Sequence, residues 1–308
     1  MGASKARNAV LAVGAIMVDV VCCVPALPAS GEGVVVESSR AVVGGCAFNS
    51  ANAARQLGAD CTLFAPVGEG IYAGFVEGAL AQRGLQAPLR VKGRDNGSCT
   101  CLVEPDGQRT MITSPGVERY FERSWFDVID AAHVSCGLAS GYEIEGSGGN
   151  AIIEFFEEHP EIQFFYAPGP RILGVGPEKH ARINALRPIW HLNDQEALAY
   201  TGCSTLEDAA RVLAAACENA VVITAGAAGS FVLEGPDACF ANVATEAVRV
   251  VDTVGAGDAH LGALAAARAA GRSWKESLEL ANKVASGVCS VEGATLSDEA
   301  FARLGVAL

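Results

Sequence analysis

Residues 250–258 have the sequence Val-Val-Asp-Thr-Val-Gly-Ala-Gly-Asp, and they connect a predicted strand to a predicted helix. The apolar residues 248–251 favour the strand, and residues 257–270 have a helical pattern that ends before a glycine. Gly255 and Gly257 allow a sharp turn in which consecutive N–H groups converge at the helix N-terminus. Such a turn forms a cup for an anion, because the helix dipole adds positive charge there.

Asp258 lies at the rim of this predicted anion site. A carboxylate without a function would repel the ligand there, so the position favours a role as a proton acceptor. No G-x-x-x-x-G-K-[ST] sequence exists in the chain, which excludes a P-loop. The dinucleotide fingerprint also fails, because His260 replaces its third glycine and the loop lies far from an opening βαβ unit. Taken alone, the loop is also compatible with a plain tight turn.

Apolar runs of strand length alternate along the chain with longer segments of helical periodicity. The predicted strands are residues 10–16, 61–67, 132–135, 164–167, 189–192, 220–224 and 230–233. The predicted helices are residues 47–57, 72–83, 150–158, 194–201, 206–216 and 274–288. Buried strands separated by helices indicate an α/β fold of three layers, with a mostly parallel sheet covered by helices on both faces.

Two regions depart from this alternation. Residues 34–43 are strand-like, and residues 96–113 contain two strand-like runs that flank the tight-turn sequence Glu104-Pro105-Asp106-Gly107. These pieces predict a small β-sheet beside the main sheet, with segments near 20–44 and 96–115. Because the chain contains no linker, low-complexity segment or repeat, we expect residues 1–308 to form one domain with this β appendage.

Composition narrows the classes of partner. A hydrophobic fraction of 50% and a net charge of −13 fit a globular protein and argue against nucleic acid, which binds clustered Lys and Arg. The 11 cysteines are scattered without a C-x-x-C, which predicts reduced, buried thiols. Lys5 and Arg7 before an apolar run imitate a signal peptide, but Asp19 interrupts that run. We therefore expect a cytoplasmic protein without a membrane partner.

Asp252-Thr253-Val254-Gly255-Ala256-Gly257-Asp258, followed by Gly262, resembles the C-terminal signature of the ribokinase-like (PfkB) carbohydrate kinases. Gly44-Gly45-Cys46-Ala47-Phe48-Asn49 is similar to the N-terminal signature of the same family. Shorter matches follow in order at residues 66–68, 193–196, 224–229, 282 and 292–294. The resemblance covers nearly the whole chain and is closest to a branch of bacterial sugar kinases whose substrates are generally unassigned.

The resemblance implies ATP-dependent phosphorylation of a hydroxymethyl group on a sugar or sugar-like molecule. Asp258 would accept the hydroxyl proton, and the amides of Gly255, Ala256, Gly257 and Asp258 would form an anion hole for the transferred phosphoryl group. A ribonucleoside such as adenosine, inosine or pseudouridine is the alternative acceptor. An NAD-dependent dehydrogenase, which His260 counts against, and a ligand sensor without catalysis are the other classes to be weighed.

On the substrate side, the resemblance implies roles for Asp19, Gly45, Asn49 and Glu143. Asp19 is predicted to be the one charge of an apolar opening strand, where it either accepts hydrogen bonds from sugar hydroxyls or stays exposed at the strand end. Asn49 either presents a donor and an acceptor to a polyol or caps its helix. Glu143 either contacts the substrate or is a surface charge.

On the nucleotide side, the implied residues are Asn193, Glu196, Thr224, Gly226, Gly229 and Asn282. Asn193 and Glu196 would organise Mg²⁺ through water, unless they only begin a helix. Asn282 would lie near the adenine, and Arg171 would reach a phosphate. His260 is expected either to pack in its helix or to tune the pocket.

Many members of this family also bind a monovalent cation beside the anion hole. A K⁺ site is therefore implied at Asp252, Val254, Val288, Val291, Gly293 and Ser297. The family also uses its β appendage as a lid over the sugar, which excludes water on closure, and often as a dimer interface. We therefore expect a lid here and a homodimer formed through it. The chain departs from the family pattern at Cys46 and His260.

Overall fold

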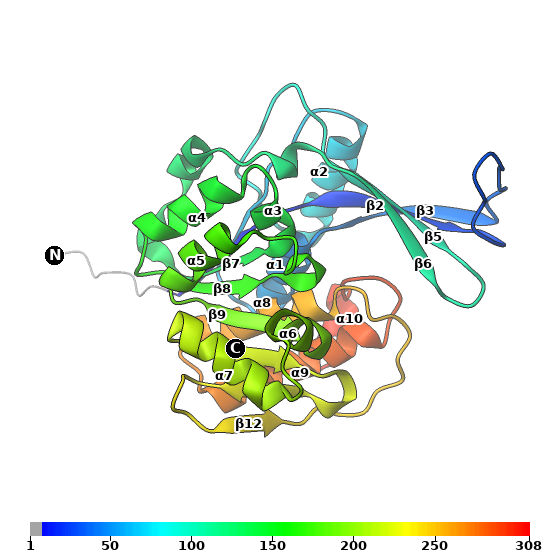
Figure 1. Cartoon of the computed structure of the whole chain (residues 1–308). Helices are drawn as coiled ribbons and strands as arrows, with labels where there is room; N and C mark the ends of the chain where they lie inside the picture. The colour runs from blue at the N-terminus through cyan, green and yellow to red at the C-terminus, as the bar shows by residue number, and fades with distance from the viewer. Residues whose placement is uncertain (1–7) are drawn as a thin grey trace.

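An eight-stranded sheet forms the centre of the structure, a computed structural model that describes residues 8–308 (Figure 1). Residues 1–7, which include Lys5 and Arg7, lie outside the described part. The strand order is β12-β11-β10-β9-β8-β7-β1-β4. The strands are β1 (Ala9–Val13), β4 (Cys61–Phe64), β7 (Val134–Ser140), β8 (Gln163–Ala167), β9 (Ile189–Asn193), β10 (Val221–Thr224), β11 (Ser230–Leu233) and β12 (Phe240–Val243). The six strands from β4 to β10 are parallel, and β11 and β12 add an antiparallel edge.

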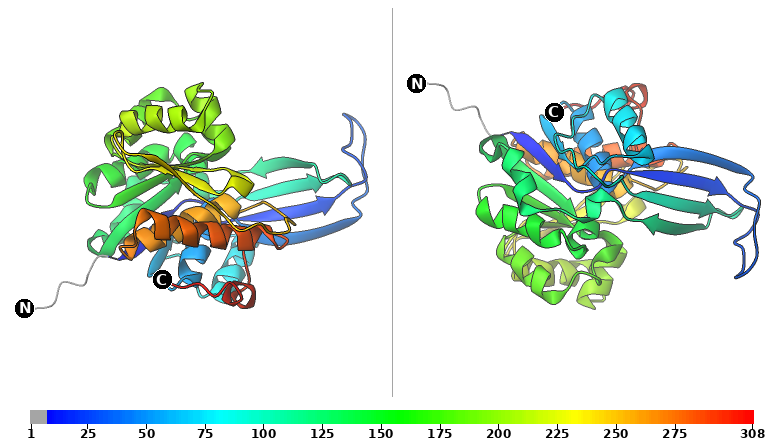
Figure 2. Two further views of the ribbon diagram at one scale, coloured as in Figure 1. Left: turned by 90° about the horizontal axis from the view of Figure 1, so that it is seen from below. Right: turned by 90° about the horizontal axis from the view of Figure 1, so that it is seen from above.

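Helices cover both faces of this sheet, as predicted (Figure 2). One layer contains α1 (Cys46–Gln56), α2 (Ile71–Arg83), α8 (Ala256–Ala269) and α9 (Trp274–Cys289). The other contains α4 (Gly149–Glu158), α5 (Pro177–Ala185), α6 (Asp194–Thr201) and α7 (Leu206–Cys217). Side chains of β1 alternate between the layers, since Val10 packs toward the first and Leu11 toward the second. This alternation explains why β1 is apolar at every position.

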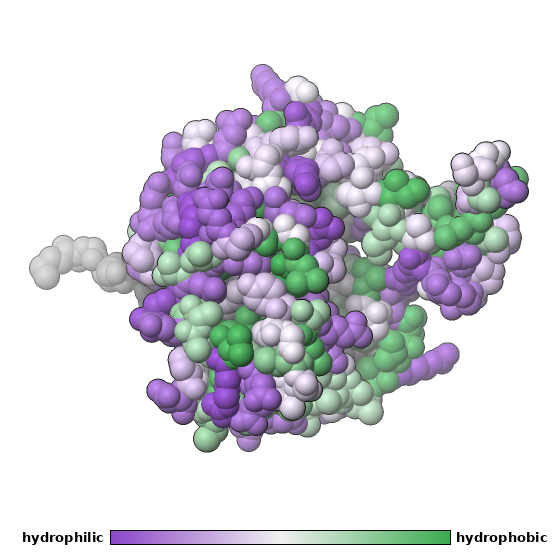
Figure 3. Space-filling view, viewed as in Figure 1, coloured by the Kyte–Doolittle hydropathy of each residue, from purple (hydrophilic) through white to green (hydrophobic). Residues whose placement is uncertain are grey.

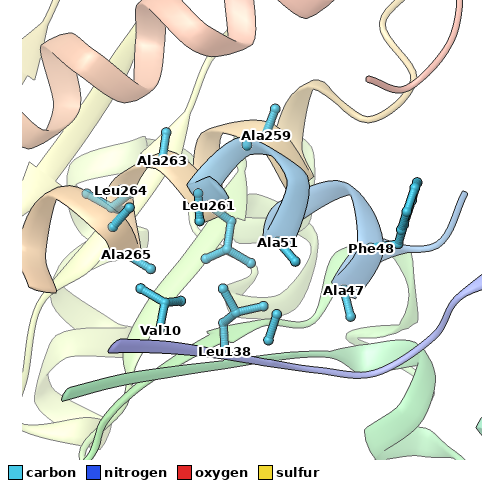
Figure 4. Close-up of a cluster of buried hydrophobic side chains, with 14 of the residues drawn as sticks. Val10, Ala47, Phe48, Ala51, Leu138, Ala259, Leu261, Ala263, Leu264 and Ala265 are labelled. Carbon is cyan, nitrogen blue, oxygen red and sulfur yellow. The ribbon is translucent and has the colours of Figure 1, made fainter. Parts of the chain in front are cut away.

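Helix α8 is buried on almost all sides, because it lies between α1, α9 and the sheet. Figure 4 shows Leu261 and Leu264 of α8 above Val10 of β1 and Leu138 of β7, with α1 alongside. Burying each leucine contributes roughly 1.5–3 kcal/mol. The many alanines of α8 let α1 approach closely, which fixes the N-terminal end of α8 relative to the start of α1.

A second sheet of four strands projects from this core, and we call it the lid (Figures 1 and 2). Its order is β3-β2-β5-β6. Its strands are β2 (Met17–Cys23), β3 (Ser38–Gly44), β5 (Ser98–Val103) and β6 (Arg109–Ser114). The β5–β6 hairpin closes at the predicted turn, where the Gly107 amide donates to the Glu104 carbonyl at 2.9 Å. The small β-sheet predicted beside the main sheet is thus confirmed.

Three local predictions were wrong. Residues 248–251 form an exposed loop rather than a strand, because no sheet edge lies beside them and the Val251 amide instead bonds the Cys289 carbonyl at the end of α9. Asp19 belongs to lid strand β2, since the opening strand ends at Val13 and Gly14 turns the chain with a φ of 151°. The strand predicted at 132–135 is shifted to β7, and a short 3₁₀ turn precedes it.

Two further observations concern the whole described chain. All 11 cysteines are free, and five of them are buried. Within residues 8–308, no helix combines the length and apolar composition needed to cross a membrane.

Candidate active site

The glycine-rich loop turns into α8 at Gly255, which has a left-handed φ of 75°. A Cβ on Gly255 would lie 2.3 Å from the Ala294 carbonyl oxygen, so both the conformation and the close approach require glycine. The Ala256 amide donates back to the Thr253 carbonyl at 3.3 Å. The amides of Gly257 and Asp258 come next, in the first helical turn, where N–H groups lack intrahelical partners. The expected anion cup therefore depends chiefly on these two amides.

Asn49 and Asp258 meet where the first turn of α1 faces the first turn of α8. The Asn49 Nδ2 donates to Asp258 Oδ2 at 2.8 Å, which fixes the orientation of the amide. The Asn49 Oδ1 is buried and has no partner, one of four such side-chain atoms in residues 8–308. A buried acceptor without a donor costs free energy unless a ligand supplies one. Asn49 is thus an intrahelical residue of α1 that presents its carbonyl oxygen beside Asp258, and Gly45 is the residue that caps this helix.

Gly45 allows that geometry because its φ is 112° and its Cα lies against the chain after β1. A Cβ there would be 2.5 Å from the Ala15 carbonyl oxygen. The backbone of α8 is also tied to α1, because the Ser50 hydroxyl donates to the Asp258 carbonyl at 2.9 Å. Burial raises the pKa of Asp258 despite the Asn49 hydrogen bond that lowers it. A carboxylate with a raised pKa is a stronger base than a free one.

Cys46 and Asp258 line the same cavity. The sequence marked Cys46 only as a departure from the family pattern and did not predict its place beside Asp258. Burial, followed by the charges of Asp258 and Glu143, raises the pKa of the Cys46 thiol well above its usual value. Cys46 is therefore a neutral thiol at the wall of the site. It has no local sequence signal, because its neighbours come from distant parts of the chain.

Asp19 projects from β2 toward Gly44, whose Cβ would lie 2.5 Å from Asp19 Oδ2. Burial raises the pKa of Asp19 to about 6. No donor within residues 8–308 is hydrogen-bonded to this carboxylate. Asp19 lines a cavity of about 650 Å³ between the lid and the body. Its position fits a ligand-binding carboxylate better than an exposed strand end.

Glu143 is buried in the short helix α3 (Gly141–Glu145), so its interpretation as a surface charge was wrong. Its Oε1 accepts from the Ala15 amide at 3.1 Å, and its Oε2 accepts from the Ser140 hydroxyl at 2.5 Å. Burial raises the pKa of Glu143 to about 7. Both oxygens are held inside the protein at the carboxyl end of β1.

Three cavities surround residues 252–258. The largest, of about 650 Å³, lies under the lid and reaches Asp252. A central cavity of about 240 Å³ is lined by Asp258, Asn193 and Glu196. A third, of about 310 Å³, lies on the other side of the loop. The loop of residues 252–258 therefore borders all three cavities. Two molecules bound in different cavities could meet at this loop, which suits a reaction between them.

Asn193 and Glu196 form a capping box at the start of α6. The Asn193 Oδ1 accepts from the Glu196 amide at 2.8 Å, and Glu196 Oε2 accepts from the Asn193 amide at 3.0 Å. The Asn193 Nδ2 also donates to Glu196 Oε1 at 2.8 Å. Burial raises the pKa of Glu196. Asn193 and Glu196 thus begin helix α6 and also line the central cavity. Their role as a helix cap is therefore compatible with the expected role near Mg²⁺.

The third cavity brings together the remaining residues expected at a nucleotide. Its lining includes Thr224, Gly226, Gly229, His260 and Asn282. The Asn282 Nδ2 donates to the Val243 carbonyl at 2.9 Å. His260 does more than pack in α8, because its Nε2 lies 3.2 Å from Asn282 Oδ1 and its Nδ1 lies 2.8 Å from His191 Nε2. Burial lowers the pKa of His260 to about 4, so the His260 imidazole is neutral at physiological pH.

Asp252, which the resemblance implies at a K⁺ site, forms an ion pair with an arginine of the lid. Its Oδ1 lies 3.0 Å from the Arg109 guanidinium of the lid. The same carboxylate accepts from the Val254 amide at 3.1 Å and from the Gly293 amide at 3.2 Å. The Arg109 guanidinium is therefore the cation that this carboxylate contacts in the structure.

Two other residues of the implied cation site also have protein partners. The Ser297 hydroxyl accepts from the Ala300 amide at the start of α10 (Asp298–Ala302), and the Val288 carbonyl accepts from the Val291 amide. No cluster of three or more His, Cys, Asp or Glu side chains in residues 8–308 could hold a metal ion. Arg171, expected at a phosphate, instead forms a bidentate ion pair with Glu145.

A lidded α/β sheet with a carboxylate at a glycine-rich helix start is the architecture of a small-molecule phosphotransferase. Residues 7–300 match the model of the pfkB family carbohydrate kinases, and the chain belongs to that family. It is therefore a kinase that transfers a phosphoryl group from ATP to an alcohol group of a sugar-like substrate, and the family generally uses Mg²⁺.

The chain is also similar to individual proteins, in sequence to one and in fold to others. The chain is 34% identical over 301 residues to the uncharacterized sugar kinase YegV of Escherichia coli (strain K12), covering 93% of this chain and 90% of that protein. The ribokinase of Thermotoga maritima has the same fold, with a TM-score of 0.81 at 19% identity over 96% of this chain and 98% of that one. The adenosine kinase of Sinorhizobium meliloti also gives a TM-score of 0.81, at 22% identity over 97% and 100% of the two chains.

Proposed function

We propose that this kinase phosphorylates a hydroxymethyl group of a sugar or sugar-like molecule, with Asp258 as the general base. The observation that carries the proposal is the contact of Asn49 Nδ2 with Asp258 Oδ2 at 2.8 Å, beside an Asn49 Oδ1 that has no partner. One hydroxyl of the acceptor donates to Asp258, and a neighbouring hydroxyl can donate to Asn49. This arrangement suits a polyol, whose adjacent hydroxyls supply both donors.

Asp258 acts as the hydroxyl begins to attack the γ-phosphorus of ATP. The O–P bond to the acceptor forms while the bond to the leaving ADP breaks, and the hydroxyl proton moves to the Asp258 carboxylate. The amides of Gly257 and Asp258, with Gly255 and Ala256 shaping the turn, stabilise the charge on the transferred group. Asp19 and Gly45 would contact the end of the acceptor that points away from Asp258. Glu143 would hold the backbone at Ala15 in place beside the acceptor.

ATP would lie in the third cavity and extend its phosphates past Thr224, Gly226 and Gly229 toward the central one. Asn282 would border the adenine. Asn193 and Glu196 would hold Mg²⁺ through water, and the ion would neutralise phosphate charge when bound. Their capping box fixes the Glu196 carboxylate at the wall of the central cavity.

A ribonucleoside remains the second candidate acceptor. The lid cavity of about 650 Å³ is lined by apolar residues including Val21, Val42 and Met111, which would accommodate a base as well as a sugar. A sensor without catalysis is the remote alternative, and turnover of any acceptor excludes it. We also propose that the lid mediates a homodimer, since every residue of β6 is exposed.

A screen of pentoses, hexoses, ketoses and nucleosides for ADP release with Mg-ATP tests the function. We expect turnover of at least one acceptor by the wild type. Asp258→Asn preserves the size and the acceptor oxygen for Asn49, so it should lower kcat roughly 10²–10⁴-fold and leave ATP binding intact. Calorimetric titration with a non-hydrolysable ATP analogue is the control for binding. Near-wild-type turnover of Asp258→Asn would remove Asp258 from this role.

A further inference from the structure

The Asp252 carboxylate is the point where three separate segments meet. It lies at the start of the catalytic loop, and its side chain is only 7% exposed. The Val254 amide ties it to its own loop, and the Gly293 amide ties it to the segment after α9. A buried carboxylate with two amide donors still carries a full negative charge, which is costly without a cation.

Arg109 supplies that cation from the lid. It is the first residue of β6, directly after the hairpin turn, and its guanidinium reaches Asp252 Oδ1 at 3.0 Å across 143 residues of sequence. The side chain of Arg109 is 33% exposed, so the pair is partly shielded from water. Burial alone would raise the pKa of Asp252, but the two amides and Arg109 together lower it.

A second lid-to-body pair provides the comparison. Arg40 of β3 contacts Glu292 at 2.5 Å, but these side chains are 45% and 64% exposed. Exposed pairs contribute little, because water and salt screen them. Arg109–Asp252 is therefore the lid contact whose loss would leave a buried negative charge without a cationic partner.

We propose that the Arg109 guanidinium serves as the built-in cation of the catalytic loop, so that this kinase needs no monovalent metal ion at Asp252. The inference rests on the proposed function, because it gives Asp252 a role in the loop that carries Asp258. A metal ion bound to the same carboxylate would lie within a few ångströms of the guanidinium, and the two cations would repel each other. The contact also makes the charge balance of the loop depend on lid position.

Thermal unfolding in KCl and in choline chloride of equal ionic strength tests this without knowledge of the acceptor. We expect the wild-type Tm to be the same in both salts. Arg109→Ala should lower the Tm by several degrees in choline chloride, and KCl should restore part of it, because K⁺ can then occupy the carboxylate. Arg40→Ala is the matched control and should show no K⁺ response. Arg109→Ala combined with Asp252→Asn should lose the response.

Once an acceptor is known, kcat measured in the same two salts gives a second test of the proposal. Arg109→Ala should lose kcat about tenfold or more in choline chloride and recover it in KCl, whereas the wild type should be indifferent to K⁺. A wild type whose Tm or kcat requires K⁺ overturns the proposal. So does an Arg109→Ala protein that has an unchanged Tm and only a higher KM for the acceptor, since Arg109 would then be a substrate contact. Failure to find any acceptor would count against the proposed function but would leave the Tm result valid.

Discussion

Glu143 and Glu145 are two residues apart in α3, and their surroundings shift their pKa values in opposite directions. Burial raises the pKa of Glu143 to about 7, whereas the hydrogen bonds from Arg171 lower that of Glu145. The folded state therefore keeps a proton on Glu143 that the unfolded chain releases near pH 4.5. Stability from this group is full below that pH and is lost as the pH rises to about 7.

Glu143→Gln should remove this pH dependence. The glutamine can accept from the Ala15 amide and donate to the Ser140 hydroxyl, so the packing is kept. We expect the variant to be more stable than the wild type above about pH 8, by at most roughly 3 kcal/mol, with the difference vanishing below about pH 5. Urea unfolding at both pH values measures it.

Glu145→Gln is the matched control and should have the opposite sign. Its lowered pKa means that its contribution is present at neutral pH and is lost as the pH falls, so the variant should be less stable than the wild type at neutral pH. An equal difference between Glu143→Gln and wild type at both pH values would mean that Glu143 is ionised throughout.

Single residues also show what the sequence could and could not reveal. Asp258 and Asn49 were predictable because each lies in a glycine-bearing signature at a helix start. Arg109 was not, because it meets Asp252 only through the lid hairpin, and no local pattern reports a contact across 143 residues. The same holds for His191, which reaches the site through its contact with His260, 69 residues away in the sequence.

At the scale of elements, the site depends on how closely α1 approaches α8. Gly262 of α8 lies against the Ser50 backbone, and a Cβ there would be 2.1 Å from the Ser50 carbonyl oxygen. That atom belongs to the backbone, so a side chain at 262 must move one helix. Because Ser50 and Asn49 both bond Asp258, the movement would reach the Asp258 carboxylate.

Gly262→Ala should therefore destabilise the protein by about 1–3 kcal/mol and lower kcat at least tenfold. Chemical denaturation and acceptor kinetics measure the two effects. Gly78→Ala on α2 is the control, because nothing lies within 4 Å of its Cβ, and it should stabilise the helix by roughly 0.5–1 kcal/mol. A Gly262→Ala protein with wild-type stability and kcat would show that the two helices can separate without cost to the site.

The elements themselves were largely predictable, since hydrophobic periodicity and glycine positions marked most helices and strands. The wrong strand predictions arose where the pairing of a segment with a neighbouring strand decides whether it becomes a strand. Residues 248–251 have strand composition but no neighbouring strand, and residues 15 and 16 follow a glycine turn instead of extending β1. The sequence also did not reveal the base of the lid, where buried Asn96 bonds the backbone of Gly68, Ile16 and Pro66.

At the scale of the molecule, the lid is the part that a single chain leaves most exposed. It projects from the body with apolar patches on its visible face (Figure 3). Met111 and Ile112 of β6 are 59% and 58% exposed, and Val42 of β3 is 40% exposed. An exposed sheet with apolar residues and free edges at β3 and β6 commonly pairs with another chain. A second copy of the same lid fits this surface, because equal patches can pair about a two-fold axis.

We therefore expect a homodimer that Ile112→Glu dissociates, since a charge on both copies would lie in the contact. Sedimentation velocity at micromolar protein measures the mass, and circular dichroism confirms that the variant folds. Val212→Glu, on the exposed face of α7 with 51% exposure, is the control and should remain dimeric. If the wild type sediments as a monomer, the lid has no second copy beside it, and the pairs Arg109–Asp252 and Arg40–Glu292 hold it to the body. If the wild type is a dimer that Ile112→Glu does not dissociate, the interface lies elsewhere.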